Sequence, residues 1–191
     1  MNPTPLRASE ETKNLKLIGC FVLCSALVRL AWLTRNSLWF DEAASLIIAR
    51  VPLREFIPIA LAVDANSLLF NFILHFWVKW LGEGLFGLRL LPLATGLLAL
   101  CAYAWFCRRH LGEKSLFPIV LGAFSGFWIY HGTEIRCYSL FLLIALVSTG
   151  LFLEIVQGNR SPKIAALYTA ALLLGLYNHL YFLYIVAGHA F

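Results

Sequence analysis

Charged side chains are scarce in this chain. Asp, Glu, Lys and Arg together make up 13% of its 191 residues, whereas hydrophobic residues make up 61%. A water-soluble globular domain contains about 25% charged residues. Because lipid offers the backbone no hydrogen-bonding partners, apolar runs of about 18 residues or more cross a membrane as helices. The composition therefore excludes a soluble domain and predicts an all-α, polytopic transmembrane helix bundle.

The chain also lacks the sequence features of nucleic-acid-binding and zinc-binding proteins. No basic patch with interleaved aromatic residues is present, so the net charge of +5 indicates loop orientation and not a nucleic-acid partner. The cysteines have no metal-ligand spacing, and we interpret them as small buried hydrophobic residues. They are Cys20, Cys24, Cys101, Cys107 and Cys137.

The first apolar run has no small-residue cleavage site, which favours a retained span over a signal peptide. The polar residues 1–16 before it predict a disordered cytoplasmic tail, and residues 17–191 form the transmembrane module. The last apolar run, 181–191, is too short to cross a core of ~30 Å, which suggests that the module is incomplete at its C-terminus. Five complete spans are predicted, at 17–34, 90–107, 116–130, 139–156 and 164–176. Arg29 interrupts the first span, where its side chain could snorkel to the interface or meet an acid.

The short basic loops set the predicted orientation. Lys and Arg are concentrated in the tail and in loops 108–114 and 158–163, which places all three on the cytoplasmic side. A full span at 67–81 would put the tail and the first of these loops on opposite sides. We therefore predict an interfacial or re-entrant helix there, together with amphipathic interfacial helices at 41–50 and 53–63 in the first external loop. The outer face then collects Asp41, Glu42, Asp64, Asn66, Arg89, Glu134, Arg136 and His179.

Two adjacent carboxylates, Asp41 and Glu42, follow the first span. Being neighbours, they cannot both face the same point. A carboxylate near an apolar interface could have a raised pKa and act as a general base. Equally, an Asp could cap a helix and a Glu in the first turn would favour its dipole. Both interpretations stay open on these residues alone.

Other polar residues on this face also have two interpretations. Glu134 and Arg136 could pair with each other, or Arg136 could join Arg89 in binding an anionic head group through the planar guanidinium fork. His179, at the outer end of the fifth span, could be a hydrogen-bonded interfacial residue, a ligand or a proton shuttle.

Several of these segments together resemble a known family. Trp39-Phe40-Asp41-Glu42-Ala43 after a first span resembles the first external loop of GT-C glycosyltransferases. The chain is most similar to the bacterial branch related to protein O-mannosyltransferases and lipid A aminoarabinose transferases. Further similar segments follow in the same order, at 64–70, 74–79, 87–92, 133–138 and 176–181. Ser67 and Leu68 stand where the family has two prolines after the residue equivalent to Asn66.

The resemblance implies a GT-C type fold and a reaction. The enzyme would transfer a sugar, with inversion, from a polyprenyl-phosphate carrier to an acceptor at the outer face of the bacterial inner (plasma) membrane. Asp41 would deprotonate the acceptor hydroxyl, with Glu42 supporting it. Arg89 and Arg136 would hold the lipid phosphate and stabilise the charge on the leaving group.

The remaining site residues carry less defined roles by resemblance. Glu134 would orient Arg136 or share the acceptor site, and His179 would contact donor or acceptor. Asp64 and Asn66 would belong to the acceptor site or to its loop. No cofactor is required by this resemblance. Some GT-C relatives bind a divalent cation through an acid in the first loop and one at a later turn, which here would be Asp41 and Glu134.

Two other classes of protein are alternatives. One is a non-catalytic or degenerate membrane protein that binds polyprenyl lipid or a partner subunit. The other is a small transporter, which needs polar residues near mid-membrane on several spans. Spans two to five have almost none, so the transporter ranks last.

Overall fold

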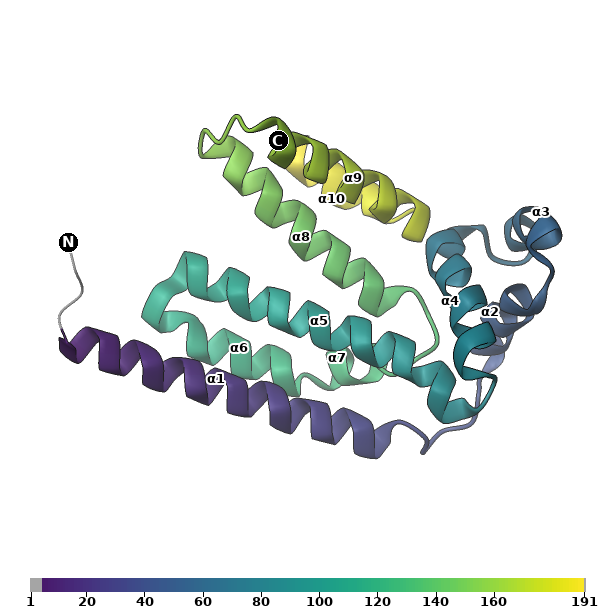
Figure 1. The fold of residues 1–191 in the computed structure, drawn as a ribbon, viewed down its shortest axis with the longest axis horizontal. Coiled ribbons are helices and arrows are strands. Elements are labelled where there is room, and N and C mark those ends of the chain that lie inside the picture. The colour runs from purple at the N-terminus through teal and green to yellow at the C-terminus, as the bar shows by residue number, and fades with distance from the viewer. Residues whose placement is uncertain (1–4, 191) are drawn as a thin grey trace.

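The chain is helical throughout the part that its computed structural model describes, which is the backbone of residues 5–190 and the side chains of residues 14–190. No strand occurs within that range. The longest helices are α1 (Pro5–Trp32), α5 (Leu85–Leu111), α8 (Tyr138–Val156) and α9 (Pro162–Asn178). Figure 1 shows these helices running along the long axis of the molecule, with α5 between α1 and α8. The predicted all-α fold is confirmed.

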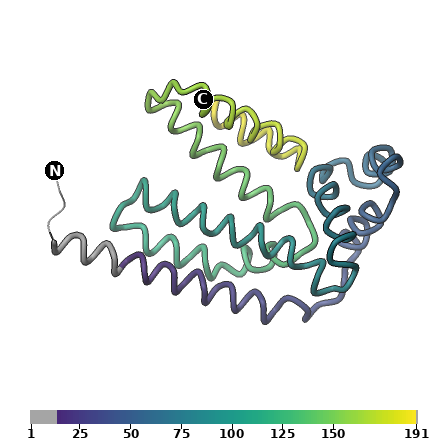
Figure 2. The backbone as a smooth tube through the Cα atoms, in the orientation of Figure 1, coloured from purple at the N-terminus to yellow at the C-terminus, as the bar shows by residue number. Residues whose placement is uncertain are grey.

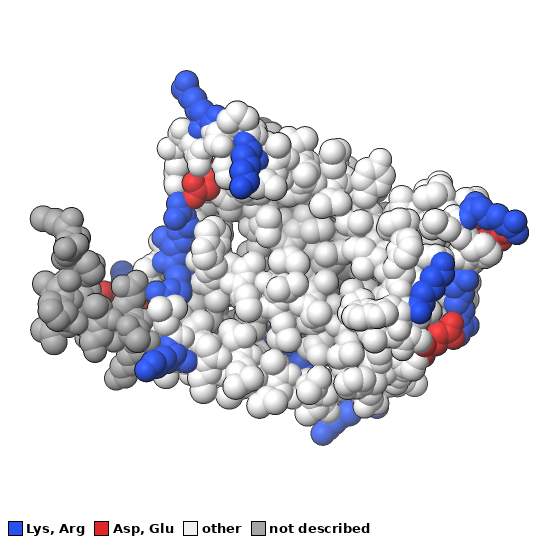
Figure 3. Space-filling model, viewed as in Figure 1, with Lys and Arg blue, Asp and Glu red and all other residues white. Residues whose placement is uncertain are grey.

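Four helical stretches are long and apolar enough to cross a membrane. They are Asn14–Trp32, Leu53–Leu81, Leu85–Phe124 and Tyr138–Val156. Large apolar side chains such as Leu23, Leu27 and Leu98 are exposed on the outer faces of these helices. In Figure 3, most charged residues lie toward the two ends of the molecule, and the band between them is largely uncharged. These features are those of a membrane protein.

The predicted disorder of the N-terminal segment is wrong for residues 5–16. Residues 5–16 were expected to be disordered, but α1 begins at Pro5 and includes them. This segment contains two each of Leu, Glu and Lys together with Ala8 and Arg7, all of them good helix formers. Adding residues to an existing helix is also far easier than nucleating a new one. Residues 1–4 of the predicted tail lie outside the described range.

The predicted span at 116–130 is also wrong as a single helix. α6 (Leu116–Phe124) ends at Ser125, which has an extended backbone with ψ 120°, and α7 (Gly126–His131) begins after it. The Ser125 side chain accepts a hydrogen bond from the backbone N–H of Trp128 and so caps α7. A serine cap followed by glycine favours a new helix start over continuation.

The last two apolar runs, 164–176 and 181–191, form short helices. α9 covers the predicted span at 164–176 and has 17 residues, which corresponds to about 26 Å at 1.5 Å per residue. The run 181–191 forms α10 (Phe182–Ala190), which packs on α8 and α9; Phe191 lies outside the described range.

Three short helices occupy one end of the bundle. α2 (Phe40–Arg50), α3 (Leu53–Asp64) and α4 (Leu68–Leu81) have 11, 12 and 14 residues. At 1.5 Å per residue, each is about 16–21 Å long, less than a membrane core. The 3₁₀ turn Ala65–Ser67 separates α3 from α4, so the apolar stretch Leu53–Leu81 is two helices and not one. Figures 1 and 2 place all three at the end opposite the N-terminus.

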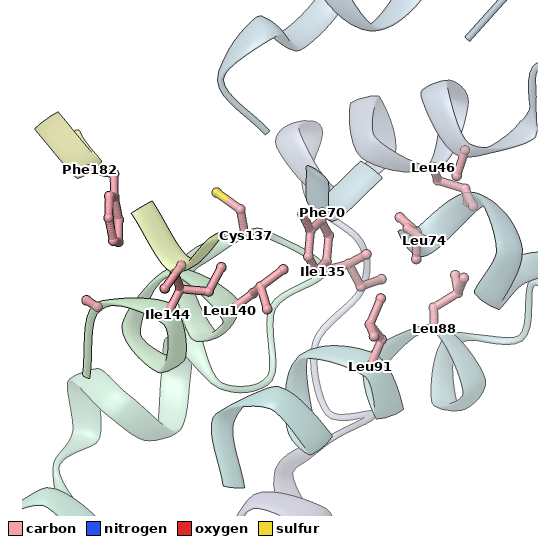
Figure 4. Packing of buried hydrophobic residues seen from close by; sticks show 13 residues of the cluster. Leu46, Phe70, Leu74, Leu88, Leu91, Ile135, Cys137, Leu140, Ile144 and Phe182 are labelled. Atoms are coloured by element: carbon pink, nitrogen blue, oxygen red, sulfur yellow. The ribbon is translucent and has the colours of Figure 1, made fainter. Parts of the chain in front are cut away.

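The main hydrophobic core joins this end cap to the bundle. Phe70 and Leu74 of α4 are fully buried beside Leu88 of α5 and Ile135 of the turn before α8. Figure 4 shows these side chains converging from different helices, with Leu46 of α2 on the far side of Leu74. The core therefore fixes the position of the polar residues of α2, α5 and the turn before α8.

The cysteines only partly match the prediction of small buried residues. Cys107 and Cys137 are buried, but Cys20, Cys24 and Cys101 are exposed on helix faces. The exposed cysteines lie within apolar runs, where a helix in a membrane faces lipid and not protein. All five are free thiols.

Candidate functional site

Charged side chains from three distant segments meet at the end of the bundle capped by α2–α4. They come from the start of α2, from the first turns of α5 and from the turn 132–137 between α7 and α8. Glu42 contacts Arg89 across 47 residues of chain and the backbone of Ile135 across 93. The prediction that the ionisable residues gather on one side is therefore confirmed for these segments.

Glu42 is completely buried and every contact it makes is structural. Its carboxylate lies 3.1 Å from Arg89 Nη2. It also accepts hydrogen bonds from the backbone N–H of Ile135 at 2.9 Å and of Trp39 at 3.2 Å. The contact with Trp39 caps the first turn of α2, because Glu42 is the third residue of the helix and reaches back to its N-cap. Glu42 thus joins α2, α5 and the turn before α8.

Arg89 completes this buried pair. Its Nη1 donates to the carbonyl of Leu33 at 2.8 Å, and Nη2 donates to the carbonyl of Ser37 at 3.3 Å as well as to Glu42. These carbonyls belong to the segment between α1 and α2. Arg89 Nε is buried without a hydrogen-bonding partner, so the guanidinium retains a free donor.

Asp41 differs from its neighbour in being half-buried and unengaged. Its carboxylate makes no hydrogen bond or ion pair with any described residue. Only its backbone is used, because the carbonyl accepts from Ser45 Oγ at 3.1 Å and lies 3.5 Å from Arg136 Nη1. Of the two adjacent acids, Asp41 is therefore the one whose carboxylate is available to a ligand.

Arg136 holds the α3–α4 turn against α2. Its Nη1 lies 2.7 Å from Asp64 Oδ2 and 3.3 Å from Ser45 Oγ. Burial opposes the charged guanidinium, but the charge of Asp64, supported by its hydrogen bond, outweighs this and raises the pKa of Arg136. The other oxygen of Asp64 accepts from the backbone N–H of Asn66 at 3.2 Å. Asn66 itself is exposed.

Glu134 does not pair with Arg136, which was one interpretation of the sequence. Its Oε2 lies 2.8 Å from His131 Nδ1, while Oε1 is buried without a partner. The two side chains of the 134–136 segment therefore point to different neighbours. Arg136 faces the end cap, and Glu134 faces α7.

His179 caps the C-terminus of α9 next to this site. Its Nδ1 accepts from the backbone N–H of Tyr181 at 3.1 Å. Burial lowers the pKa of His179; the nearby Asp64 opposes that effect and Arg136 adds to it. A neutral imidazole is therefore favoured near pH 7, which suits a proton acceptor better than an anion-binding cation.

Candidate metal ligands do not cluster in the described part of the chain. Within it, no group of three or more His, Cys, Asp or Glu side chains is arranged to hold a metal ion. Asp41 has a free carboxylate, and Glu134 is bound to His131.

Sequence reasoning missed three contributors to the site. They are Ser45, which accepts a hydrogen bond from Arg136, and His131, which is hydrogen-bonded to Glu134. The third is the Leu33 carbonyl, which accepts from Arg89. Ser45 lies four residues after Asp41, one helical turn along α2, and that spacing was the available signal. A backbone carbonyl at the end of α1 leaves no trace in the sequence.

Comparisons of this chain with protein families, with curated proteins and with solved structures give no match.

Proposed function

We propose that this chain is a membrane glycosyltransferase of the GT-C type, or a module of one. It would move a sugar from a polyprenyl-phosphate-linked donor to an acceptor at the outer face of a bacterial inner membrane, with Asp41 as the general base. The observation that carries the proposal is the contrast between the neighbouring acids. Glu42 is buried in a fixed ion pair, whereas the Asp41 carboxylate beside it is held in place by α2 and has no partner.

The geometry is suited to such a reaction. A general base needs a carboxylate that is positioned but free to accept a proton. The short helices α2–α4 give the acceptor and a long lipid donor a platform at the end of the bundle, where interfacial helices lie on a membrane.

The buried arginines have the character of leaving-group stabilisers. The Nε atoms of Arg89 and Arg136 are both buried and have no hydrogen-bonding partner. Donors held in a water-excluded site stabilise developing negative charge more strongly than donors in water. Because both Nε atoms are buried, each arginine would act on the donor phosphate through its positive charge while its bonds to protein fix its position.

Asp41→Asn tests the proposal directly. Transfer of labelled hexose from a polyprenyl-phosphate donor should fall by roughly 100-fold or more, the usual contribution of a general base. Melting temperature and membrane insertion should not change, because the carboxylate has no partner to lose. Glu55→Gln, at a surface acid of α3 paired with Arg54, is the matched control and should leave transfer intact. Retained transfer in Asp41→Asn would exclude Asp41 as the base.

A second function has one specific observation in its favour. Both buried arginines of the site already have an acidic partner within the chain, in the ion pairs Glu42–Arg89 and Asp64–Arg136. This is expected of a scaffold that binds polyprenyl lipid or a partner subunit without catalysis. Wild-type protein that binds the polyprenyl donor and transfers no sugar would support this alternative.

A further inference from the structure

Arg29 is a buried cation without an acid. It is 1% exposed and lies in the outer third of α1, within an apolar stretch that could span a membrane. The sequence predicted that it snorkels or meets an acid, but its guanidinium does neither. Nη1 donates to Ser25 Oγ and, at 3.4 Å, to the carbonyl of Ala123, and Nε has no partner. No ion pair of Arg29 occurs among the described residues.

A cavity of about 450 Å³ opens beside this side chain, between α1, α5, α7 and α8. Four aromatic side chains dominate its wall. Arg29, His131 and Ser139 are the polar exceptions. The aromatic lining residues are Phe127, Trp128, Tyr138 and Phe141.

Two glycines allow close packing of the backbone beside the guanidinium. A Cβ on Gly132 would lie 3.4 Å from Arg29 Nε and 2.8 Å from the carbonyl of Trp128. A Cβ on Gly96 would lie 3.2 Å from the Gly132 Cα. The backbone of the 132–137 turn can therefore approach both α5 and Arg29.

An uncompensated charge in such a place is unfavourable. Moving an ion out of water has an effective penalty of several kcal/mol even after the protein relaxes, unless an opposite charge or several hydrogen bonds offset it. Ligand pockets of roughly 300–1,000 Å³ with apolar walls and a few polar groups are typical of small-molecule sites. Arg29 is the charged group of such a pocket, and a phosphate fits the planar fork of an arginine.

We propose that this cavity binds a phosphate-bearing amphiphile, with Arg29 contacting the phosphate and the aromatic wall contacting the apolar chain. The Ser139 hydroxyl, which is hydrogen-bonded to Thr95 at 2.6 Å, adds a polar group beside the phosphate. His131 joins the cavity to Glu134 of the candidate site. Binding here is separate from the Glu42–Arg89 and Asp64–Arg136 pairs and does not require the transfer reaction.

Titration of the full chain in micelles of a polyoxyethylene detergent, which carries no phosphate, tests this site in the absence of sugar donor and acceptor. Decyl phosphate is the probe, and decyl maltoside and inorganic phosphate are the comparison ligands. Decyl phosphate should bind at least 10-fold more tightly than either. Arg29→Met should weaken its binding by roughly 10- to 100-fold, the size expected for losing hydrogen bonds to a charged group.

Arg35→Met is the matched control, because Arg35 is exposed just beyond α1 and stacks over Trp32 at 4.5 Å. It should leave decyl phosphate binding unchanged. Equal binding of decyl phosphate to wild type and Arg29→Met would overturn the role of Arg29. If decyl maltoside bound as tightly as decyl phosphate, the site would not require a phosphate. If inorganic phosphate bound as tightly, the site would not require an apolar chain.

A second variant fills the cavity from another lining residue, Leu142 of α8. Leu142→Trp leaves Arg29 in place and should reduce decyl phosphate binding as strongly, so the result does not depend on the folding of Arg29→Met. Undiminished binding in Leu142→Trp would place the ligand elsewhere. Because no sugar is transferred in this assay, loss of binding and loss of glycosyltransferase activity are independent outcomes.

Discussion

Neighbouring carboxylates at the start of α2 have opposite surroundings. The side chain of Glu42 points into the protein and is fixed by Arg89 and two backbone N–H groups. The side chain of Asp41, one residue earlier on the helix, is rotated by about 100° and keeps its carboxylate free. One acid therefore maintains the structure, and the other remains available for chemistry.

Glu42→Gln tests the structural half of this division. The substitution keeps the size of the side chain but leaves the buried Arg89 without a counter-charge. Breaking a buried ion pair from one side destabilises by about 3–5 kcal/mol, and reversible unfolding of the purified chain in mixed micelles measures the change. A second substitution, Arg89→Met, should restore part of the loss, because it removes the unpaired charge.

The matched control is Glu83→Gln. Glu83 pairs with Arg50 at 2.6 Å, but both side chains are largely exposed, and such surface pairs add little to stability. A loss in Glu42→Gln no larger than that in Glu83→Gln would contradict a structural role for the buried pair.

At the scale of elements, the turn between α9 and α10 depends on one small residue. Gly175 is buried in the last turns of α9, and a Cβ there would overlap the ring of Phe182, which begins α10 and is fully buried. The absence of a side chain therefore lets α10 fold back against α9 and α8. This packing holds His179 next to Tyr138 and Phe141.

Gly175→Ala should accordingly destabilise the chain by about 1–3 kcal/mol, the usual effect of overpacking a filled core. The melting temperature in detergent reports the change, and Phe182→Leu in the same chain should reverse most of it. Gly188→Ala, in open space on α10, is the control and should be neutral or slightly stabilising because alanine favours helix. Equal melting temperatures for both alanine variants would rule out the close contact.

At the scale of the whole molecule, polar residues are divided between two ends of an apolar bundle. The α5–α6 and α8–α9 connections lie at the N-terminal end in Figure 1, and a contact between Arg109 and Glu154 joins α5 to α8 there. The candidate site lies at the other end with α2–α4. Because short basic segments favour the cytoplasm, we predict that the site end lies outside.

Cysteine labelling tests this arrangement. In a chain whose five native cysteines are replaced by alanine, Glu83→Cys should react with an impermeant maleimide on intact cells. Arg160→Cys should react only after the cells are permeabilised. Both positions are exposed and lie at opposite ends of the bundle. Labelling of both from the same side would contradict the two-ended arrangement.

Much of the fold could be predicted from local sequence. Apolar runs indicate helices in lipid. The number of runs between successive basic loops predicted which loops share a side, and so predicted that the charged residues of the candidate site lie at one end. The same reasoning failed at 116–130 and at 5–16, because hydropathy does not detect a serine cap within an apolar run or a polar segment that extends a neighbouring helix. For the site, the residues Asp41, Glu42, Arg89 and Arg136 could be identified, but not their partners.

By itself, the sequence determined that this protein is helical, apolar enough for a membrane, and polar at two ends, because composition and charge act locally along the chain. The tertiary structure alone decided that Glu42 pairs with Arg89, that Arg136 pairs with Asp64, and that Arg29 has no acid. Those outcomes depend on how segments 47 to 94 residues apart pack together. Side-chain partners across that separation are set by the angles and offsets of packed helices, which no local pattern specifies.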